Sequence, residues 1–128
     1  MTVLYIGGAA QGKRALAMAT HSLIESQVAQ GGALQSADEL RTAKMLDQLH
    51  LLTRRMLERG EQPSQLLPWL QDKVVVCDEI GCGIVPLDPF ERQWREETGR
   101  LCCEIAKVAG TVIRVHCGLP QFIKGTLP

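Results

Sequence analysis

A glycine-rich stretch near the amino terminus, GGAAQGK over residues 7–13, has the spacing of a phosphate-binding loop. Glycines let the backbone curl with its N–H groups inward, and a helix that follows directs the positive end of its dipole at the same point. The pattern predicts a nucleotide-phosphate site, and a purely structural turn between a strand and a helix is the alternative. The residues expected to bind the phosphates are Gly7, Gly8, Ala9, Ala10, Gln11, Gly12, Lys13 and Arg14.

The residue after the lysine departs from the usual loop sequence. Serine or threonine normally follows, and its hydroxyl holds Mg²⁺. Here the residue is Arg14, which cannot coordinate a metal. Its guanidinium can bind phosphate oxygens, unless it points into water. Mg²⁺ is therefore doubtful as a cofactor, and we predict no metal ligands.

Two acidic positions follow apolar runs. The stretch VVVCDE at residues 74–79 resembles a Walker B strand, in which an acid at the strand end orients Mg²⁺ through water. Solvated carboxylates at the end of a buried strand are the alternative. Asp47 also follows an apolar pair, but it is only a surface residue if its whole segment is helical. A structural role is the favoured interpretation of all three histidines, His21, His50 and His116.

The elements that must position these residues alternate between strands and helices. The sequence predicts strands over residues 2–6, 73–79 and 111–118, and helices over residues 12–21, 36–42, 63–72 and 88–110. Residues 22–29 are a candidate strand. Residues 43–59 are either one helix or a short strand over 43–48 followed by a helix, and residues 119–128 are expected to be a tail.

Continuous apolar strands separated by helices predict an α/β fold. We expect a single domain over residues 1–128, with a mainly parallel sheet covered by helices on both faces. Ligands bind beyond the carboxyl ends of the strands in such sheets. Residues 7–13, Asp78-Glu79 and Gly118 all follow strand ends, so we expect them to meet at one edge of the sheet.

Composition argues against several classes of partner. The 128 residues are 45% hydrophobic and 22% charged, which is typical of a globular domain. Fourteen basic and 14 acidic residues balance, so there is no overall field for nucleic acid or an anionic membrane. No apolar run approaches the ~20 residues of a membrane span. A strand-like run begins directly after Met1, without a charged segment or a cleavage site, so we expect no secretory signal.

Cysteine usage points to a reducing compartment. The five cysteines form no C-x-x-C pair, so neither a disulfide framework nor a zinc site is expected. We expect reduced and mostly buried thiols in a cytoplasmic protein. The cysteines are Cys77, Cys82, Cys102, Cys103 and Cys117.

The sequence from residue 78 to residue 125 resembles the adenosylcobinamide kinase/adenosylcobinamide-phosphate guanylyltransferase family. That family reads strand, N-E-x-G-x-G-I-V-P, a helix with R-x-F/W-R-x-x-x-G-R, a second strand, then G-x-P/G and a lysine. The matching residues are Glu79, Gly81, Gly83, Ile84, Val85, Pro86, Arg92, Trp94, Arg95, Gly99, Arg100, Gly118 and Lys124.

The amino-terminal half shows the same resemblance more loosely. Gly7, Gly8, Gly12 and Lys13 match the family's G-G-x-x-x-G-K-S. The stretch LDQLHLLTRRML at residues 46–57 is similar to D-C-L-T-L-W-x-x-N-L-L. This match favours a strand followed by a helix over residues 43–59.

The resemblance implies a P-loop (RecA-like) domain that acts in the last steps of assembling the lower ligand of cobalamin. The family phosphorylates adenosylcobinamide with ATP or GTP, and then transfers GMP from GTP to that phosphate through a guanylylated histidine. For this chain it implies a nucleoside triphosphate and a corrinoid, adenosylcobinamide, as ligands, and a homo-oligomer, by resemblance a trimer. It also implies that Lys13 holds phosphates, that Asp47 orients a metal and that Glu79 assists catalysis.

Three departures from the family pattern bear on activity. Arg14 replaces the metal-binding serine, and Asp78 stands where the family has asparagine. The segment before the Asp47 strand is shortened and lacks the R-I-x-x-H motif that supplies the nucleophilic histidine. We therefore expect guanylyl transfer to be lost.

Several functions stay open after this comparison. One is a nucleotide-dependent kinase acting on a cobinamide-like substrate, and another is a non-catalytic nucleotide-binding or regulatory paralogue. A redox role for Cys77, Cys82 and Cys102 is a third alternative.

Overall fold

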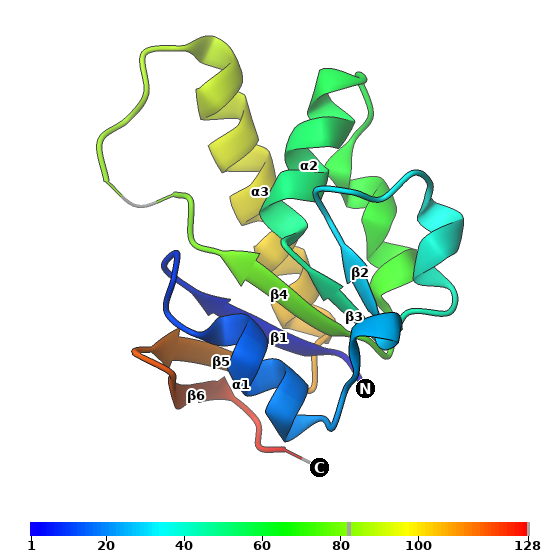
Figure 1. The fold of residues 1–128 in the computed structure, drawn as a ribbon. Helices are drawn as coiled ribbons and strands as arrows, with labels where there is room; N and C mark the ends of the chain where they lie inside the picture. Colours follow the sequence, from blue (N-terminus) through cyan, green and yellow to red (C-terminus); the bar gives the residue numbers. More distant parts are fainter. Residues whose placement is uncertain (82, 128) are drawn as a thin grey trace.

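The computed structural model, which describes residues 1–81 and 83–127, is built around one six-stranded sheet (Figure 1). Its strands are β1 (Val3–Gly7), β2 (Val28–Gln30), β3 (Met45–Asp47), β4 (Val74–Asp78), β5 (Thr111–His116) and β6 (Leu119–Lys124). Their order across the sheet is β2-β3-β4-β1-β5-β6. All neighbours pair in parallel except β6, which is antiparallel to β5. The predicted mainly parallel α/β sheet is confirmed.

Helices cover both faces of the sheet, as predicted. The helix α1 (Lys13–Thr20) lies on one face, whereas α2 (Leu49–Glu58) and α3 (Pro89–Val108) lie on the other (Figure 1). Short 3₁₀ turns at Glu25–Gln27, Ala37–Leu40 and Pro63–Leu70 connect these elements. No helix in the described part of the chain is both long enough and apolar enough to cross a membrane.

The two faces carry separate apolar cores because side chains alternate along each strand. The core beneath α1 contains Val3, Tyr5, Ala17, Met45, Val74, Val76, Ile113 and Val115. The core beneath α2 and α3 includes Leu4, Leu46, Leu49, Leu52, Val75, Cys77, Leu101, Ile105 and Val112. Within β4, therefore, Val76 and Cys77 point to opposite sides of the sheet.

The ambiguous segment over residues 43–59 is a strand followed by a helix, β3 and α2. This arrangement places Asp47 at the carboxyl end of a buried strand.

The turn that follows β2 needs a glycine at residue 31, because a Cβ there would lie 2.0 Å from the carbonyl oxygen of Gln48. The guanidinium of Arg55 donates to the Gly31 carbonyl at 3.2 Å, which ties this turn to α2.

The shortened segment between α1 and β3 keeps a strand but no α-helix. The candidate strand over residues 22–29 is shifted, since β2 spans only Val28–Gln30. The predicted helix over residues 36–42 is a four-residue 3₁₀ turn at Ala37–Leu40. A capping contact is present at its start, because the Ser36 N–H donates to Glu39 Oε2 at 3.0 Å.

The expectation of a tail over residues 119–128 is wrong in part, because residues 119–124 form β6. Cys117 and Gly118 have φ angles of 51° and 76°, which is the pattern of a two-residue type I′ hairpin turn. Pro120 lacks an N–H donor, but β6 is the edge of the sheet, where proline is tolerated.

A lysine ties this edge strand to the rest of the fold. Lys124 Nζ donates to the carbonyl oxygens of Ala106 at 2.9 Å and Lys107 at 3.0 Å, near the carboxyl end of α3. Those carbonyls lack partners further along the helix, and they carry the negative end of its dipole. Lys124, one of the residues that match the family pattern, therefore has a structural contact in this fold.

Candidate functional site

The glycine-rich loop between β1 and α1 meets the ends of two other strands, as strand order predicted. The Glu79 N–H donates to the Gly7 carbonyl at 2.8 Å, and the Gly118 N–H donates to the Gln11 carbonyl at 2.7 Å. Gly7 itself is closely packed, since a Cβ there would lie 2.7 Å from the carbonyl oxygen of Val115. The loop, the end of β4 and the β5–β6 turn therefore share one edge of the sheet.

The loop is curved by residues in the left-handed region. Ala10 has a φ of 58°, and Gly12, the N-cap of α1, has a φ of 86°. A Cβ on Gly12 would lie 3.3 Å from Gly118 Cα, so this position also favours glycine for space. The Gln11 Oε1 accepts from the Cys117 N–H at 2.7 Å and holds the loop against the hairpin.

Lys13 lies at the start of α1 and is almost completely buried, with 6% of its surface exposed. Its ammonium donates to the Gly8 carbonyl at 2.7 Å, so the side chain folds back over the loop. The same nitrogen lies 2.7 Å from Asp78 Oδ1. The positive charge of the loop is therefore already paired with a carboxylate.

His50 holds that carboxylate from the other side. The Asp78 N–H donates to His50 Nδ1 at 3.3 Å, and His50 Nε2 lies 3.4 Å from Asp78 Oδ2. Because Nδ1 accepts a hydrogen bond and Nε2 faces a carboxylate oxygen, the ring proton is assigned to Nε2. Burial lowers the pKa of His50, and the nearby Asp78 carboxylate opposes that effect without reversing it. A neutral ring with both nitrogens engaged has no free lone pair for covalent chemistry.

Arg14 bridges two carboxylates at the opposite wall. Its Nη1 donates to Asp47 Oδ2 at 3.1 Å, and its Nη2 pairs with the Glu25 carboxylate. Asp47 is 5% exposed, and its second oxygen accepts from the Gln48 N–H at 2.9 Å. The hydrogen bond with Glu25 raises the pKa of Arg14 further above its ordinary value.

This arrangement does not fit a magnesium ion. A metal would have to lie between residue 14 and Asp47, and the guanidinium of Arg14 joins that carboxylate directly. Across residues 1–81 and 83–127, no three His, Cys, Asp or Glu side chains are grouped so that they could hold a metal ion. The Arg14 guanidinium places a positive charge at this position.

Glu79 is not brought to the same place as Lys13 and Asp47. Its carboxylate pairs with Arg114 Nη2 at 2.9 Å. Although its backbone N–H bonds to the loop, Glu79 is absent from the described residues that line the cleft next to Lys13. Of the three expected catalytic residues, Lys13 and Asp47 line this cleft, whereas the Glu79 carboxylate is paired with Arg114.

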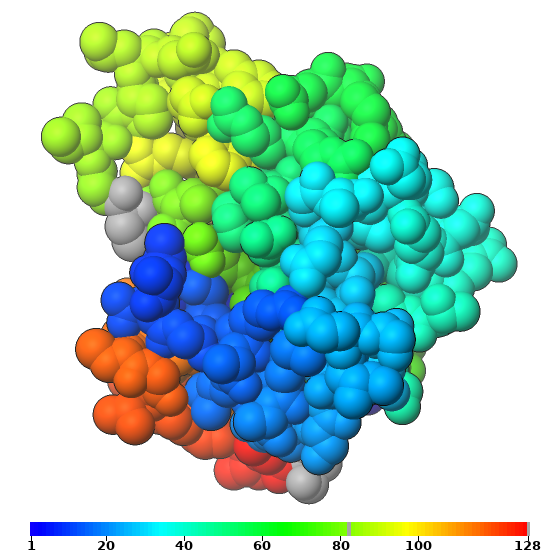
Figure 2. All heavy atoms as spheres, viewed as in Figure 1, coloured from blue at the N-terminus to red at the C-terminus, as the bar shows by residue number. Residues whose placement is uncertain are grey.

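The cleft itself is open and has a volume of about 580 Å³. Figure 2 shows the face that carries α1 in blue, flanked by the segment that follows α1 and by the carboxyl-terminal strands in orange and red. Two cations, Lys13 and Arg14, face two carboxylates, Asp47 and Asp78. The cleft lining consists of Ala10, Gln11, Gly12, Lys13, Arg14, Ala15, Met18, Asp47, Gln48, His50, Val76 and Asp78.

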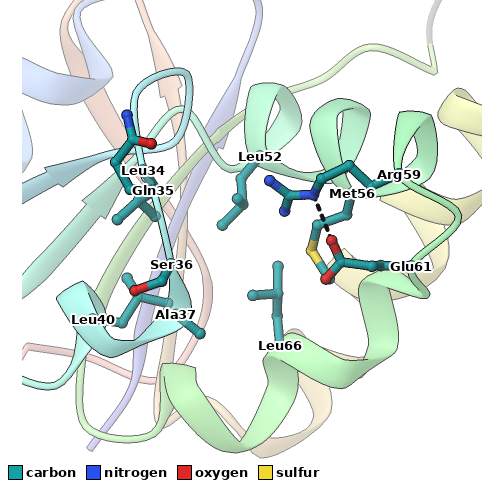
Figure 3. Close-up of a pocket in the computed structure, with 10 residues that line it drawn as sticks. All are labelled: Leu34, Gln35, Ser36, Ala37, Leu40, Leu52, Met56, Arg59, Glu61 and Leu66. Carbon is teal, nitrogen blue, oxygen red and sulfur yellow. Dashed lines mark hydrogen bonds and ion pairs between the residues drawn. The ribbon is translucent and has the colours of Figure 1, made fainter.

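A second cavity of about 410 Å³ lies among α2 and the 3₁₀ turns at Ala37–Leu40 and Pro63–Leu70 (Figure 3). Its charged residues, Arg59 and Glu61, pair with each other at 2.5 Å. The rest of its wall is mainly aliphatic, with Leu34, Leu40, Leu52, Met56 and Leu66 pointing inward (Figure 3). The cleft at the glycine-rich loop is therefore the better candidate for a phosphate ligand.

The cysteines differ from the expectation of mostly buried thiols. Cys77 is buried and Cys102 is partly buried, but Cys103 on α3 and Cys117 in the hairpin turn are exposed. Cys82, part of the alternative redox interpretation, lies outside the described residues.

Comparison with known families agrees with the geometry. Residues 11–123 match the family model described as cobinamide kinase / cobinamide phosphate guanyltransferase. No match was found among curated proteins. The match covers the loop from Gln11 onward, both acidic strand ends and most of β6.

Proposed function

Because the chain belongs to the cobinamide kinase / cobinamide phosphate guanyltransferase family, we propose that it binds GTP or ATP at the glycine-rich loop. The family supports a nucleotide-binding function in cobalamin biosynthesis. The observation that best supports the proposed site is the curved loop at the start of α1, with Lys13 folded over it at 2.7 Å from the Gly8 carbonyl. The proposed unit is one domain over residues 1–128.

The proposed binding does not use Mg²⁺. The Arg14 guanidinium pairs with Asp47 at 3.1 Å and places a positive charge beside the loop. A guanidinium binds phosphate oxygens through a planar set of donors, so it substitutes for part of the charge that a metal would bring. The nucleotide phosphates then contact the loop amides, Lys13 and Arg14.

Calorimetric titration of GTP, with Mg²⁺ and with a chelator, tests this arrangement. We expect the Kd of the unaltered protein to change by no more than about twofold on adding Mg²⁺. In Arg14→Ser the hydroxyl is restored and Asp47 is released, so affinity should become dependent on Mg²⁺. Arg41→Ser, which removes an exposed arginine paired with Asp38, is the matched control.

The opposite result has a clear signature. Strong tightening by Mg²⁺ in the unaltered protein, with no effect of Arg14→Ser, would show that the arginine does not replace the metal.

We also propose that guanylyl transfer is lost. Residues 22–44 contain no histidine, and in place of an α-helix they form β2 and the 3₁₀ turns. His21 Nε2 is hydrogen-bonded to the Tyr5 hydroxyl at 2.9 Å, and both ring nitrogens of His50 are engaged by Asp78. The His50 ring therefore presents no unoccupied nitrogen to a bound nucleotide, and Nε2 of His21 is already engaged.

Incubation with GTP labelled at its α-phosphate tests this loss. We expect no acid-labile label on the protein after separation from free nucleotide. A labelled histidine would contradict the proposal.

GTP consumption in the presence of adenosylcobinamide separates the two remaining functions, a kinase and a non-catalytic nucleotide-binding paralogue. Both carboxylate oxygens of Asp47 already accept hydrogen bonds, from Arg14 and from the Gln48 N–H, and this favours the non-catalytic function.

The wider proposal includes a corrinoid ligand, adenosylcobinamide, a trimeric assembly and a cytoplasmic location. The corrinoid and the trimer rest on the family resemblance. Exposed apolar side chains on β6, namely Leu119, Phe122 and Ile123, also support an assembly surface. The cytoplasmic location rests on cysteine usage.

A further inference from the structure

Two thiols meet on the side of β4 that faces away from the cleft. Cys77 in β4 and Cys102 in α3 are 25 positions apart in the sequence, and their sulfur atoms lie 3.7 Å from each other. Cys77 is completely buried, whereas Cys102 is partly buried. The next residue after Cys77 is Asp78, whose carboxylate lines the cleft.

We propose that Cys77 and Cys102 are a redox modification site, at which oxidation forms a reversible disulfide between β4 and α3. The sulfur atoms must approach from 3.7 Å to about 2.05 Å. The strand β4 is held by β1 on one side and β3 on the other. The adjustment therefore falls mainly on α3 and on the two side-chain rotamers.

A peroxide is the oxidant that this site requires. The Cys102 thiolate attacks one peroxide oxygen, so an S–O bond forms, the O–O bond breaks and the released hydroxide takes up a proton to become water. The resulting sulfenic acid is attacked by Cys77, so the S–S bond forms and the hydroxyl leaves as a second water with the Cys77 proton. Two thiols lose two electrons, and one hydrogen peroxide becomes two waters.

The order of these steps follows from access and ionisation. Cys102 is partly exposed to small solutes, and Cys77 is not. The contact between the two sulfurs lowers the pKa of Cys102 and raises that of Cys77. Cys102 is therefore the first thiol to ionise and to meet the peroxide, and Cys77 resolves the sulfenic acid.

Oxidation at this site is also connected to the wall of the cleft, through contacts that run from α3 to His50 and from His50 to Asp78. The Trp94 indole N–H on α3 donates to the His50 carbonyl at 2.7 Å, and His50 holds Asp78. A disulfide would fix α3 against the strand that ends at Asp78.

The test is hydrogen peroxide treatment of the full chain, alkylation of the remaining thiols and mass spectrometry without reduction. Trypsin leaves Cys77 with Cys82 in one peptide, over residues 74–92, and Cys102 with Cys103 in another, over residues 101–107. The link is therefore assigned in the double variant Cys82→Ser/Cys103→Ser, which keeps the proposed pair. We expect these two peptides to be joined and to separate on adding dithiothreitol.

Thermal unfolding provides an independent readout. Because the disulfide closes a loop in the unfolded chain, oxidation of the double variant should raise its Tm by about 5 to 10 °C. Cys102→Ser and Cys77→Ser should abolish both the link and the shift, whereas Cys103→Ser should leave both in place. Oxidation confined to Cys103 or Cys117, or a double variant that remains unlinked, would overturn the proposal.

Discussion

Replacing Lys13 with methionine should weaken GTP binding by at least about 30-fold, measured as Kd by calorimetry. The ammonium is the positive charge that lies over the loop, 2.7 Å from the Gly8 carbonyl. A charge-assisted hydrogen bond to phosphate contributes roughly 2 kcal/mol or more. Methionine keeps most of the aliphatic packing, so the expected loss comes from the charge and its hydrogen bonds.

The controls separate phosphate binding from damage to the fold. Lys13→Met also leaves the Asp78 carboxylate without its partner at 2.7 Å. The unpaired carboxylate would repel phosphate even if the loop itself were unchanged. The double variant Lys13→Met/Asp78→Asn removes this repulsion, and it should recover only part of the affinity. Lys107→Met removes an exposed lysine paired with Glu104 and should leave Kd unchanged. An unchanged Kd in Lys13→Met would place the nucleotide outside this cleft.

The position of the loop could be predicted from sequence because its signals are local. An apolar run before GGAAQGK and a helix-forming stretch after it predict a strand, a loop and a helix, and β1 and α1 agree within a residue or two. Asp88 and Pro89 similarly predict the start of α3. The Asp88 carboxylate accepts from the Phe90 N–H at 2.8 Å, as an N-cap does.

The hairpin at the carboxyl terminus was missed for a physical reason. A type I′ turn needs positive φ at both central positions, and Asn-Gly or Asp-Gly is its usual sequence signal. Here the first position is Cys117, which gives no such signal. Pro120 also argues against a strand unless the strand is known to lie at an edge.

The side-chain pairs in the cleft could not be predicted from spacing. Arg14 and Asp47 are 33 positions apart, and their 3.1 Å contact depends on how α1 crosses the end of β3. From the sequence, the Arg14 side chain is expected either to bind phosphate oxygens or to point into water. Neither alternative includes its pairing with two carboxylates, and this pairing determines how the cleft is charged.

The cleft as a whole is close to electrically balanced, which is unusual for a site proposed to bind several phosphate charges. Lys13 is neutralised by Asp78, and Arg14 by Asp47 and Glu25. A nucleotide must therefore compete with carboxylates for the same donors. Of these acids, Asp78 is the one that stands where the family has asparagine, so the substitution has a direct electrostatic consequence.

Asp78→Asn should accordingly strengthen GTP binding, by roughly 5- to 30-fold in Kd. The substitution removes one negative charge beside the proposed phosphate position, and at an effective dielectric between protein and water such a charge is worth about 1 to 2 kcal/mol. The asparagine oxygen can still accept from Lys13, so the lysine keeps its position. The 3.4 Å contact with His50 Nε2 is lost, because two N–H groups would then face each other.

Salt dependence distinguishes this electrostatic gain from a change of structure. The advantage of Asp78→Asn over the unaltered protein should shrink as NaCl is raised, because screening weakens the repulsion that the substitution removes. Asp72→Asn is the matched control: it makes the same chemical change on an exposed residue before the opposite end of β4, and should not alter Kd. Affinity that is unchanged or weaker in Asp78→Asn would mean that bound phosphate does not lie near this carboxylate, and that Lys13 is held by Asp78 for structural reasons alone.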